Sequence, residues 1–175
     1  MEKKRSISVV IPSFDGKLLL EKYLPCLMKT LKECELILQY ETIVVDDAST
    51  DGTDAFLAEN YPEVIYLKNT ENMGFSKTSN RGLHQAKHEL VLFLNNDMVL
   101  NDDFFEKTIP YFDQEDTFGV FSEIRDSLGE KKLEGQKTPK CKKHRIHYED
   151  NKETKGPFTF YLCGGNALVS REKMV

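Results

Sequence analysis

The stretch Glu89–Leu100, which reads ELVLFLNNDMVL, decides the fold. Its first part is five consecutive apolar residues, Leu90 to Leu94, and it turns polar at Asn95, Asn96 and Asp97. A short apolar run without alternation is typical of a strand buried on both faces of a parallel sheet. Such sheets bind ligands at the carboxyl ends of their strands, and Asp and Asn oxygens suit Mg²⁺ or Mn²⁺. Taken alone, the three side chains are explained equally well as a polar turn.

Outward from this strand, apolar strand patterns alternate with helical patterns. Strands are expected at 6–11, 41–46, 64–67 and 90–94, with a further apolar segment at 118–121. Helices are expected between them, and Pro25 inside the first predicts a kink or a late start of that helix. This alternation predicts an α/β, Rossmann-like fold: a mostly parallel sheet with helices on both faces.

The chain is expected to form a single domain with three parts: a core at 1–121, a basic excursion at 122–157 and a returning segment at 158–175. Between Lys131 and Arg145, seven Lys and Arg residues stand against one acidic residue, Glu134. We interpret the excursion as hairpins and loops, and 158–162 as a strand. The basic stretch is explained either as a solvated surface or as a contact for an anionic acceptor or lipid headgroups.

Composition excludes several classes of protein. The net charge of −5 argues against general nucleic-acid binding. No apolar run is long enough to span a membrane, and the apolar stretch near the N-terminus is too short for a signal peptide. Four cysteines without a CxxC pair argue against a zinc site and suggest reduced thiols in the cytoplasm. Neither GxGxxG after the first strand nor GxxxxGK[ST] occurs, which disfavours dinucleotide and Walker-type sites.

Polar clusters follow three of the expected strands, at 12–15, 46–52 and 95–97. In a doubly wound sheet, the loops after these strands can converge on one edge. Three such clusters on one edge indicate a ligand site more strongly than a single acidic turn does.

These segments, together with Asn72–Phe75 and Cys163–Asn166, resemble glycosyltransferase family 2 in their order and spacing. The rhamnosyltransferase-like branch is the most similar. The resemblance implies a GT-A fold in which 1–121 is the nucleotide-binding core and 158–175 begins the acceptor-side part. It implies Mg²⁺ or Mn²⁺ at Asp97, and an acceptor side at Gly164, Gly165 and Asn166. It also implies a nucleotide-sugar site at Pro12, Phe14, Asp15, Asp47, Ser49, Lys77, Asn80, Arg81, Asn95 and Asn96.

The resemblance also suggests individual roles. Asp47 would accept a hydrogen bond from the base, and Phe14 would either pack on the base or belong to the core. Asp15 stands where the family usually has Asn. Lys77 and Arg81 share one helix face, and they would either meet phosphate near the helix N-terminus or face solvent.

The implied activity is inverting, metal-assisted transfer of a sugar from a UDP- or dTDP-type donor to a glycan, lipid-linked or other hydroxyl acceptor. The implied setting is polysaccharide or cell-wall synthesis in the cytoplasm or at the inner face of the membrane. The family's catalytic base is expected beyond Val175, so this chain is expected to be the donor-binding part with little activity. One alternative is a nucleotide-sugar-binding module without transferase activity. A nucleotidyltransferase is a further alternative, but it would normally have a glycine-rich loop with Arg or Lys after the first strand.

Overall fold

The structure is a computed structural model that describes residues 3–142, 145–150, 159 and 161–174. The chain forms two compact units, residues 1–120 with 164–175, and residues 121–163. The described helices are α1 (Lys17–Glu33), α2 (Thr53–Asn60), α3 (Phe75–Gln85), α4 (Phe104–Thr108) and the 3₁₀ helix η1 (Ile109–Asp113). The main sheet contains β1 (Arg5–Ser13), β2 (Ile37–Asp46), β3 (Ile65–Lys68), β4 (Leu90–Leu94), β5 (Gly119–Phe121) and β10 (Asn166–Ser170).

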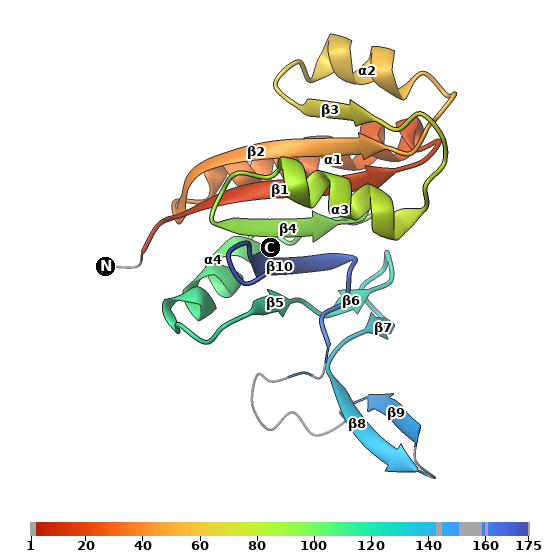
Figure 1. The fold of residues 1–175 in the computed structure, drawn as a ribbon. Helices are drawn as coiled ribbons and strands as arrows, with labels where there is room; N and C mark the ends of the chain where they lie inside the picture. Colours follow the sequence, from red (N-terminus) through yellow and green to blue (C-terminus); the bar gives the residue numbers. More distant parts are fainter. Residues whose placement is uncertain (1–2, 143–144, 151–158, 160, 175) are drawn as a thin grey trace. The chain divides into compact units, whose positions relative to one another are not determined.

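The strand order of this sheet is β3-β2-β1-β4-β10-β5, as Figure 1 shows. β1 pairs in parallel with β2 and β4, and β2 pairs in parallel with β3, whereas β10 runs antiparallel to β4. All five residues of β4 are buried, because β1 and β10 flank the strand and side chains cover both of its faces. The predicted α/β fold with a mostly parallel sheet is confirmed.

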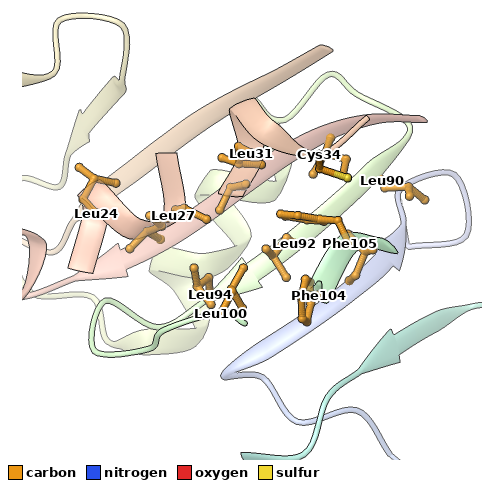
Figure 2. Close-up of a cluster of buried hydrophobic side chains, with 14 of the residues drawn as sticks. Leu24, Leu27, Leu31, Cys34, Leu90, Leu92, Leu94, Leu100, Phe104 and Phe105 are labelled. Atoms are coloured by element: carbon orange, nitrogen blue, oxygen red, sulfur yellow. The ribbon is translucent and has the colours of Figure 1, made fainter. Parts of the chain in front are cut away.

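Helices cover both faces of the sheet. On one face, Leu24, Leu27 and Leu31 of α1 form a buried cluster with Leu92 of β4 and Phe105 of α4 (Figure 2). On the opposite face, α3 lies close to β1 and β2. A Cβ built on Gly82 of α3 would lie 2.3 Å from Val10 Cγ1 and 3.1 Å from Val45 Cγ2. The glycine therefore lets the helix approach the strands more closely than any larger residue would allow.

The structure differs from the sequence predictions at several boundaries. α1 begins at Lys17 and contains Pro25 in its interior, so the predicted late start is wrong. β2 begins at Ile37 rather than at residue 41. Its first four residues are half-buried or exposed and lack the apolar run that marks a buried strand, so they were not predicted. β10, at Asn166–Ser170, was not predicted as a strand.

The second unit contains β6 (Ile124–Arg125), β7 (Lys132–Glu134), β8 (Lys137–Lys142) and β9 (Arg145–Asp150). β6 pairs antiparallel with β7, and β8 pairs antiparallel with β9, which confirms the predicted hairpins. Of the strand predicted at 158–162, residues 158 and 160 lie outside the described residues, and the other three are not in a strand.

Lysines of the basic stretch pair with acidic side chains of the same unit. The ion pairs are Lys132–Glu123, Lys137–Glu134 and Lys140–Glu149. Two of these acidic partners lie outside the 131–145 window, which made the sequence look more basic than the folded unit is. Membrane contact through this stretch stays a prediction. None of the helices in the described part of the chain is long and apolar enough to cross a membrane.

We predict that Gly82→Ala destabilises the fold by about 1–3 kcal/mol, because the added methyl group overpacks the interface between α3 and β1. Urea unfolding followed by circular dichroism measures this change. His84→Ala, an exposed change on the same helix, is the control and should stay within about 0.5 kcal/mol of wild type. Equal stability of Gly82→Ala and wild type would contradict the close approach.

Candidate functional site

A cavity of about 380 Å³ lies at the carboxyl ends of β1, β2 and β4. It brings together six residues predicted for the site, namely Pro12, Phe14, Asp47, Asn95, Asn96 and Asp97. Residues of all three polar clusters line the cavity, so the clusters converge as the parallel topology predicts. The cavity is also lined by six residues that the sequence analysis did not assign to it: Ser13, Leu19, Asn72, Gly74, Phe75 and Thr78.

Hydrogen bonds tie the loop after β1 to the loop after β2. The Asp15 N–H donates to Ser49 Oγ at 2.8 Å, and the Thr50 N–H donates to Asp15 Oδ1 at 3.0 Å. Asp15 adopts a positive φ of 44°, a conformation that Asn and Asp tolerate better than other side chains. This tolerance explains why Asp can stand at the family's usual Asn position. Asp15 and Ser49 do not line the cavity; they shape the loops that border it.

Asp47 is buried and fastens the loop that leads into α3. Its Oδ1 accepts the Asn69 side-chain amide at 2.7 Å and the Met73 N–H at 2.8 Å, and its Oδ2 accepts the Gly74 N–H at 2.8 Å. Burial by itself would raise the pKa of Asp47, but these bonds and the Thr78 hydroxyl outweigh burial, so the pKa lies below its ordinary value. Asp47 is therefore an ionised acceptor that holds the start of α3 against β2.

The preceding carboxylate, Asp46, is fully buried and turned inward. It accepts hydrogen bonds from Ser49 N–H and Oγ and from the Tyr66 hydroxyl. Burial raises the pKa of Tyr66, and the Asp46 carboxylate raises it further. Tyr66 therefore keeps its proton and remains a hydrogen-bond donor. Ser49 thus serves Asp46 and Asp15 rather than the cavity.

Asn95, Asn96 and Asp97 form a turn directly after β4. The Asn95 N–H donates to the Gly165 carbonyl at 3.0 Å, and the Met98 N–H donates back to the Asn95 carbonyl at 3.3 Å. The Asn96 side-chain amide donates to Ser13 Oγ at 3.0 Å. The turn is therefore held at both of its asparagines, while the side chain of Asp97 is exposed at the cavity.

The cavity residues fit a divalent cation that is shared with a ligand. Within the described residues, no group of three or more His, Cys, Asp or Glu side chains could hold a metal ion by itself. Mg²⁺, however, is commonly held by one or two carboxylates together with substrate phosphates and water. Asp97 supplies one carboxylate, and the buried Asn95 Oδ1 has no hydrogen-bond partner among the described residues. A metal–diphosphate ligand would supply the remaining oxygens.

The three predicted residues on α3 lie outside the cavity. Lys77, Asn80 and Arg81 are exposed and do not line it. Arg81 donates to the Lys68 carbonyl at 2.8 Å and to Asn69 Oδ1 at 2.5 Å, so its guanidinium holds α3 to the end of β3. The N–H groups of Met73 and Gly74 before this helix are bonded to Asp47, and that carboxylate already complements the helix dipole. A phosphate at this helix N-terminus is therefore disfavoured.

The predicted acceptor-side residues lie next to the cavity. A Cβ built on Gly164 would lie 3.8 Å from Phe75 Cε1, and Gly165 accepts the Asn95 N–H. Asn166 is buried and pairs with Leu94 in the sheet. Phe75, which links the cavity to Gly164, is more than half exposed and was missed by the sequence analysis. The available signal in the sequence was an aromatic residue directly after Asn72-Met73-Gly74.

The model of glycosyl transferase family 2 matches residues 8–174. The chain belongs to glycosyltransferase family 2. This family 2 chain is 31% identical over 112 residues to poly(ribitol-phosphate) β-N-acetylglucosaminyltransferase TarS of Staphylococcus aureus, an alignment that covers 61% of this chain and 19% of TarS. It is 36% identical over 103 residues to undecaprenyl-phosphate 4-deoxy-4-formamido-L-arabinose transferase of Proteus mirabilis. This alignment covers 55% of this chain and 30% of the transferase.

Solved glycosyltransferase structures share its fold. The mannosyltransferase PcManGT from Pyrobaculum calidifontis, in complex with GDP-Man and Mn²⁺, superposes with a TM-score of 0.61 at 23% identity, covering 70% of this chain and 36% of that one. S. aureus TarS in complex with UDP-GlcNAc superposes with a TM-score of 0.59 at 23% identity. The superposition covers 69% of this chain and 34% of that one. The chain thus has the GT-A-like fold and spans less than half the length of these relatives. The rhamnosyltransferase-like branch stays a prediction.

We predict that Asp47→Asn destabilises the fold most near neutral pH. The lowered pKa means that Asp47 stabilises the folded state above about pH 4 and that this contribution is lost as the pH falls through the folded-state pKa. The amide would also present a donor to backbone N–H groups. We expect a loss of about 1.5–3 kcal/mol at neutral pH, shrinking as the pH falls to about 3.

Urea unfolding of wild type and variant across this pH range measures the difference. Glu71→Gln removes an exposed carboxylate from the same loop and should have little effect. A stability gap that is independent of pH would contradict the role of the ionised Asp47 carboxylate.

Proposed function

We propose that this family 2 chain binds a nucleotide-diphosphate-sugar in the cavity, with a divalent cation at Asp97, for inverting transfer of the sugar to a hydroxyl acceptor. The observation that carries the proposal is the convergence of an ionised acceptor, exposed aromatic rings and an exposed carboxylate in one cavity at the carboxyl ends of parallel strands. The nucleotide-sugar complexes of the structural neighbours support it.

The base is proposed to lie between Asp47 and the aromatic rings of Phe14 and Phe75. Both rings line the cavity and are more than half exposed, so a planar base would bury apolar surface against them. A carboxylate offers about four lone-pair sites. Asn69, Met73 and Gly74 use three of these sites on Asp47, and the Thr78 hydroxyl, which lines the same cavity, also bonds to it. The one acceptor open to a ligand is therefore the site that the Thr78 hydroxyl would release. A single imide N–H, as in uracil or thymine, suits that acceptor, whereas the paired N–H donors of guanine would need two.

The diphosphate is proposed to lie toward the Asn95–Asp97 turn. Asp97 would hold the cation, and the Asn95 and Asn96 side chains, which line the same cavity, would contact the ribose or phosphates. When bound, Mg²⁺ or Mn²⁺ would act as a Lewis acid on the leaving diphosphate. Gly164 and Gly165 lie beside the cavity and would border the sugar and the acceptor.

The acceptor hydroxyl needs a general base. Among the described residues that line the cavity, two carry carboxylates. Asp47 accepts hydrogen bonds from the loop before α3, and Asp97 is assigned to the cation. This favours donor binding as the part of the reaction that these residues carry, with little turnover by the 175 residues alone. A nucleotide-sugar-binding module without transferase activity is the second candidate, supported by the same observation.

The acceptor is proposed to be a glycan or lipid-linked carrier in cell-wall or polysaccharide synthesis. The names of two relatives support this class: TarS, and the teichuronic acid biosynthesis glycosyltransferase TuaG of Bacillus subtilis, described as putative, with 31% identity over 113 residues. The cytoplasmic location and a contact with the membrane stay predictions.

We expect UDP and dTDP with Mn²⁺ to raise the melting temperature more than GDP does, and NAD to leave it unchanged. Binding to the folded state at about 100 times Kd adds about 2.7 kcal/mol, which corresponds to roughly 5–10 °C for a chain of this size. A thermal-shift panel of the four compounds, with Mn²⁺ and with EDTA, measures this. Equal shifts for NAD and UDP would reject the site, and equal shifts for GDP would reject the single-acceptor argument.

We expect Asp97→Ala to abolish the Mn²⁺ dependence of UDP binding while leaving the free energy of unfolding within about 0.5 kcal/mol of wild type, because this side chain is exposed. Calorimetric titration of UDP with and without Mn²⁺ measures the dependence. Asp102→Ala, an exposed carboxylate a few residues further along the chain, is the matched control. A variant that keeps its Mn²⁺ dependence would show that Asp97 is not a metal ligand.

A further inference from the structure

Gly16, just before α1, occupies a site without room for a side chain. It is buried, and a Cβ built on it would lie 2.3 Å from Asn96 Nδ2 and 2.3 Å from Ser13 Oγ. Real Cβ atoms do not approach other atoms so closely. The φ of Gly16 is −105°, a value that any L-residue adopts, so the backbone conformation does not require glycine. The requirement is space for the two side chains above it.

Those two side chains form a hydrogen bond that anchors the Asn95–Asp97 turn. Ser13 is 4% exposed, and its Oγ accepts the Asn96 amide at 3.0 Å. Asn96 lies inside the turn closed by the Met98 N–H and the Asn95 carbonyl, directly before Asp97. Movement of the Asn96 side chain would therefore rotate the turn that carries the Asp97 carboxylate.

We propose that Ser13 and Gly16 are positioning residues for the cation: Ser13 holds Asn96, Gly16 leaves the space for that bond, and together they aim Asp97 into the cavity. This inference rests on the proposed function, in which Asp97 holds the cation with the donor diphosphate. Neither residue touches the cation. Their effect is transmitted through the orientation of a ligand, as in other metal sites where partners of the ligands tune affinity.

Ser13→Ala and Gly16→Ala test the proposal from two directions. The first removes the acceptor without adding bulk, and the second pushes the bonded pair apart. Ser8→Ala is the matched control for the first, since Ser8 is a fully buried serine on the same strand that bonds to Glu41 and to the His88 N–H. Gly82→Ala is the matched control for the second, because its Cβ would also lie 2.3 Å from a side-chain atom, away from the cavity.

Two quantities are measured for each variant: the Kd for Mn²⁺ at saturating UDP, from the electron paramagnetic resonance signal of free Mn²⁺, and the Kd for UDP in EDTA. We expect the Mn²⁺ Kd of Ser13→Ala and Gly16→Ala to rise roughly 10- to 100-fold, as it does when outer partners of metal ligands are removed. Their UDP Kd in EDTA should change much less than their Mn²⁺ Kd, because in the absence of the cation only the contact of the displaced Asn96 with the nucleotide is altered. The two controls should lose stability but keep the Mn²⁺ Kd of wild type.

Wild-type Mn²⁺ affinity in Ser13→Ala would overturn the proposal, even if Gly16→Ala failed to fold. An equal loss of Mn²⁺ affinity in the two controls would also overturn it, because the effect would then follow stability alone. Failure of the proposed function would give a different experimental result. In that case the wild-type chain itself would bind no Mn²⁺ in the presence of UDP. That result would reject both the proposed function and the positioning role of Ser13 and Gly16.

Discussion

The complete burial of β4 is the constraint on which the rest of the structure depends. Its five apolar residues lie between β1 and β10 and between helices on the two faces of the sheet, so no polar side chain can project from the strand. Polar chemistry can begin only where the strand ends, at Asn95. Because β1 and β2 run parallel to β4, their ends meet the same edge, and the loops that follow them are forced into one neighbourhood. The cavity is a direct consequence of this packing.

The carboxylates near the cavity divide into those that hold its loops together and one, Asp97, that is exposed in it. Asp46 and Asp47 are buried and accept hydrogen bonds from their own and neighbouring loops, while Asp15 and Asp51 bond across to Thr50 and Lys17. Unpaired buried carboxylates would cost free energy, and these bonds remove that cost. The density of acidic residues in the second polar cluster therefore reflects loop architecture more than metal binding. Asp15 and Asp51 are also exposed but bond to neighbouring loops, whereas Asp97 is exposed and lines the cavity.

The fold could be predicted because its main determinants are local. The apolar runs mark the central strands, and the rules of parallel topology bring their loops together. Longer-range features could not be read in this way. The partners of Asp47 come from Met73 and Gly74, and the space that Gly16 leaves is used by Asn96, about 80 residues later. β10 was not predicted as a strand because it is defined by its antiparallel pairing with β4 rather than by a distinctive pattern in its own sequence. The resemblance implied Lys77 and Arg81 for the site, with a solvent-facing position as the alternative. Neither their charge nor their spacing reveals that Asp47 already bonds to the N–H groups before that helix.

A cation held by one exposed carboxylate makes metal and nucleotide binding interdependent. A single carboxylate in contact with water attracts a dication weakly, since solvent screens the charge. In the proposed function the diphosphate supplies the second anionic partner, and the factor by which nucleotide strengthens cation binding must equal the factor by which the cation strengthens nucleotide binding. That coupling depends on the distance and direction between Asp97 and the diphosphate, not on further negative charge. A turn held by Ser13 and by the Gly165 carbonyl keeps this geometry without adding carboxylates that would repel the donor.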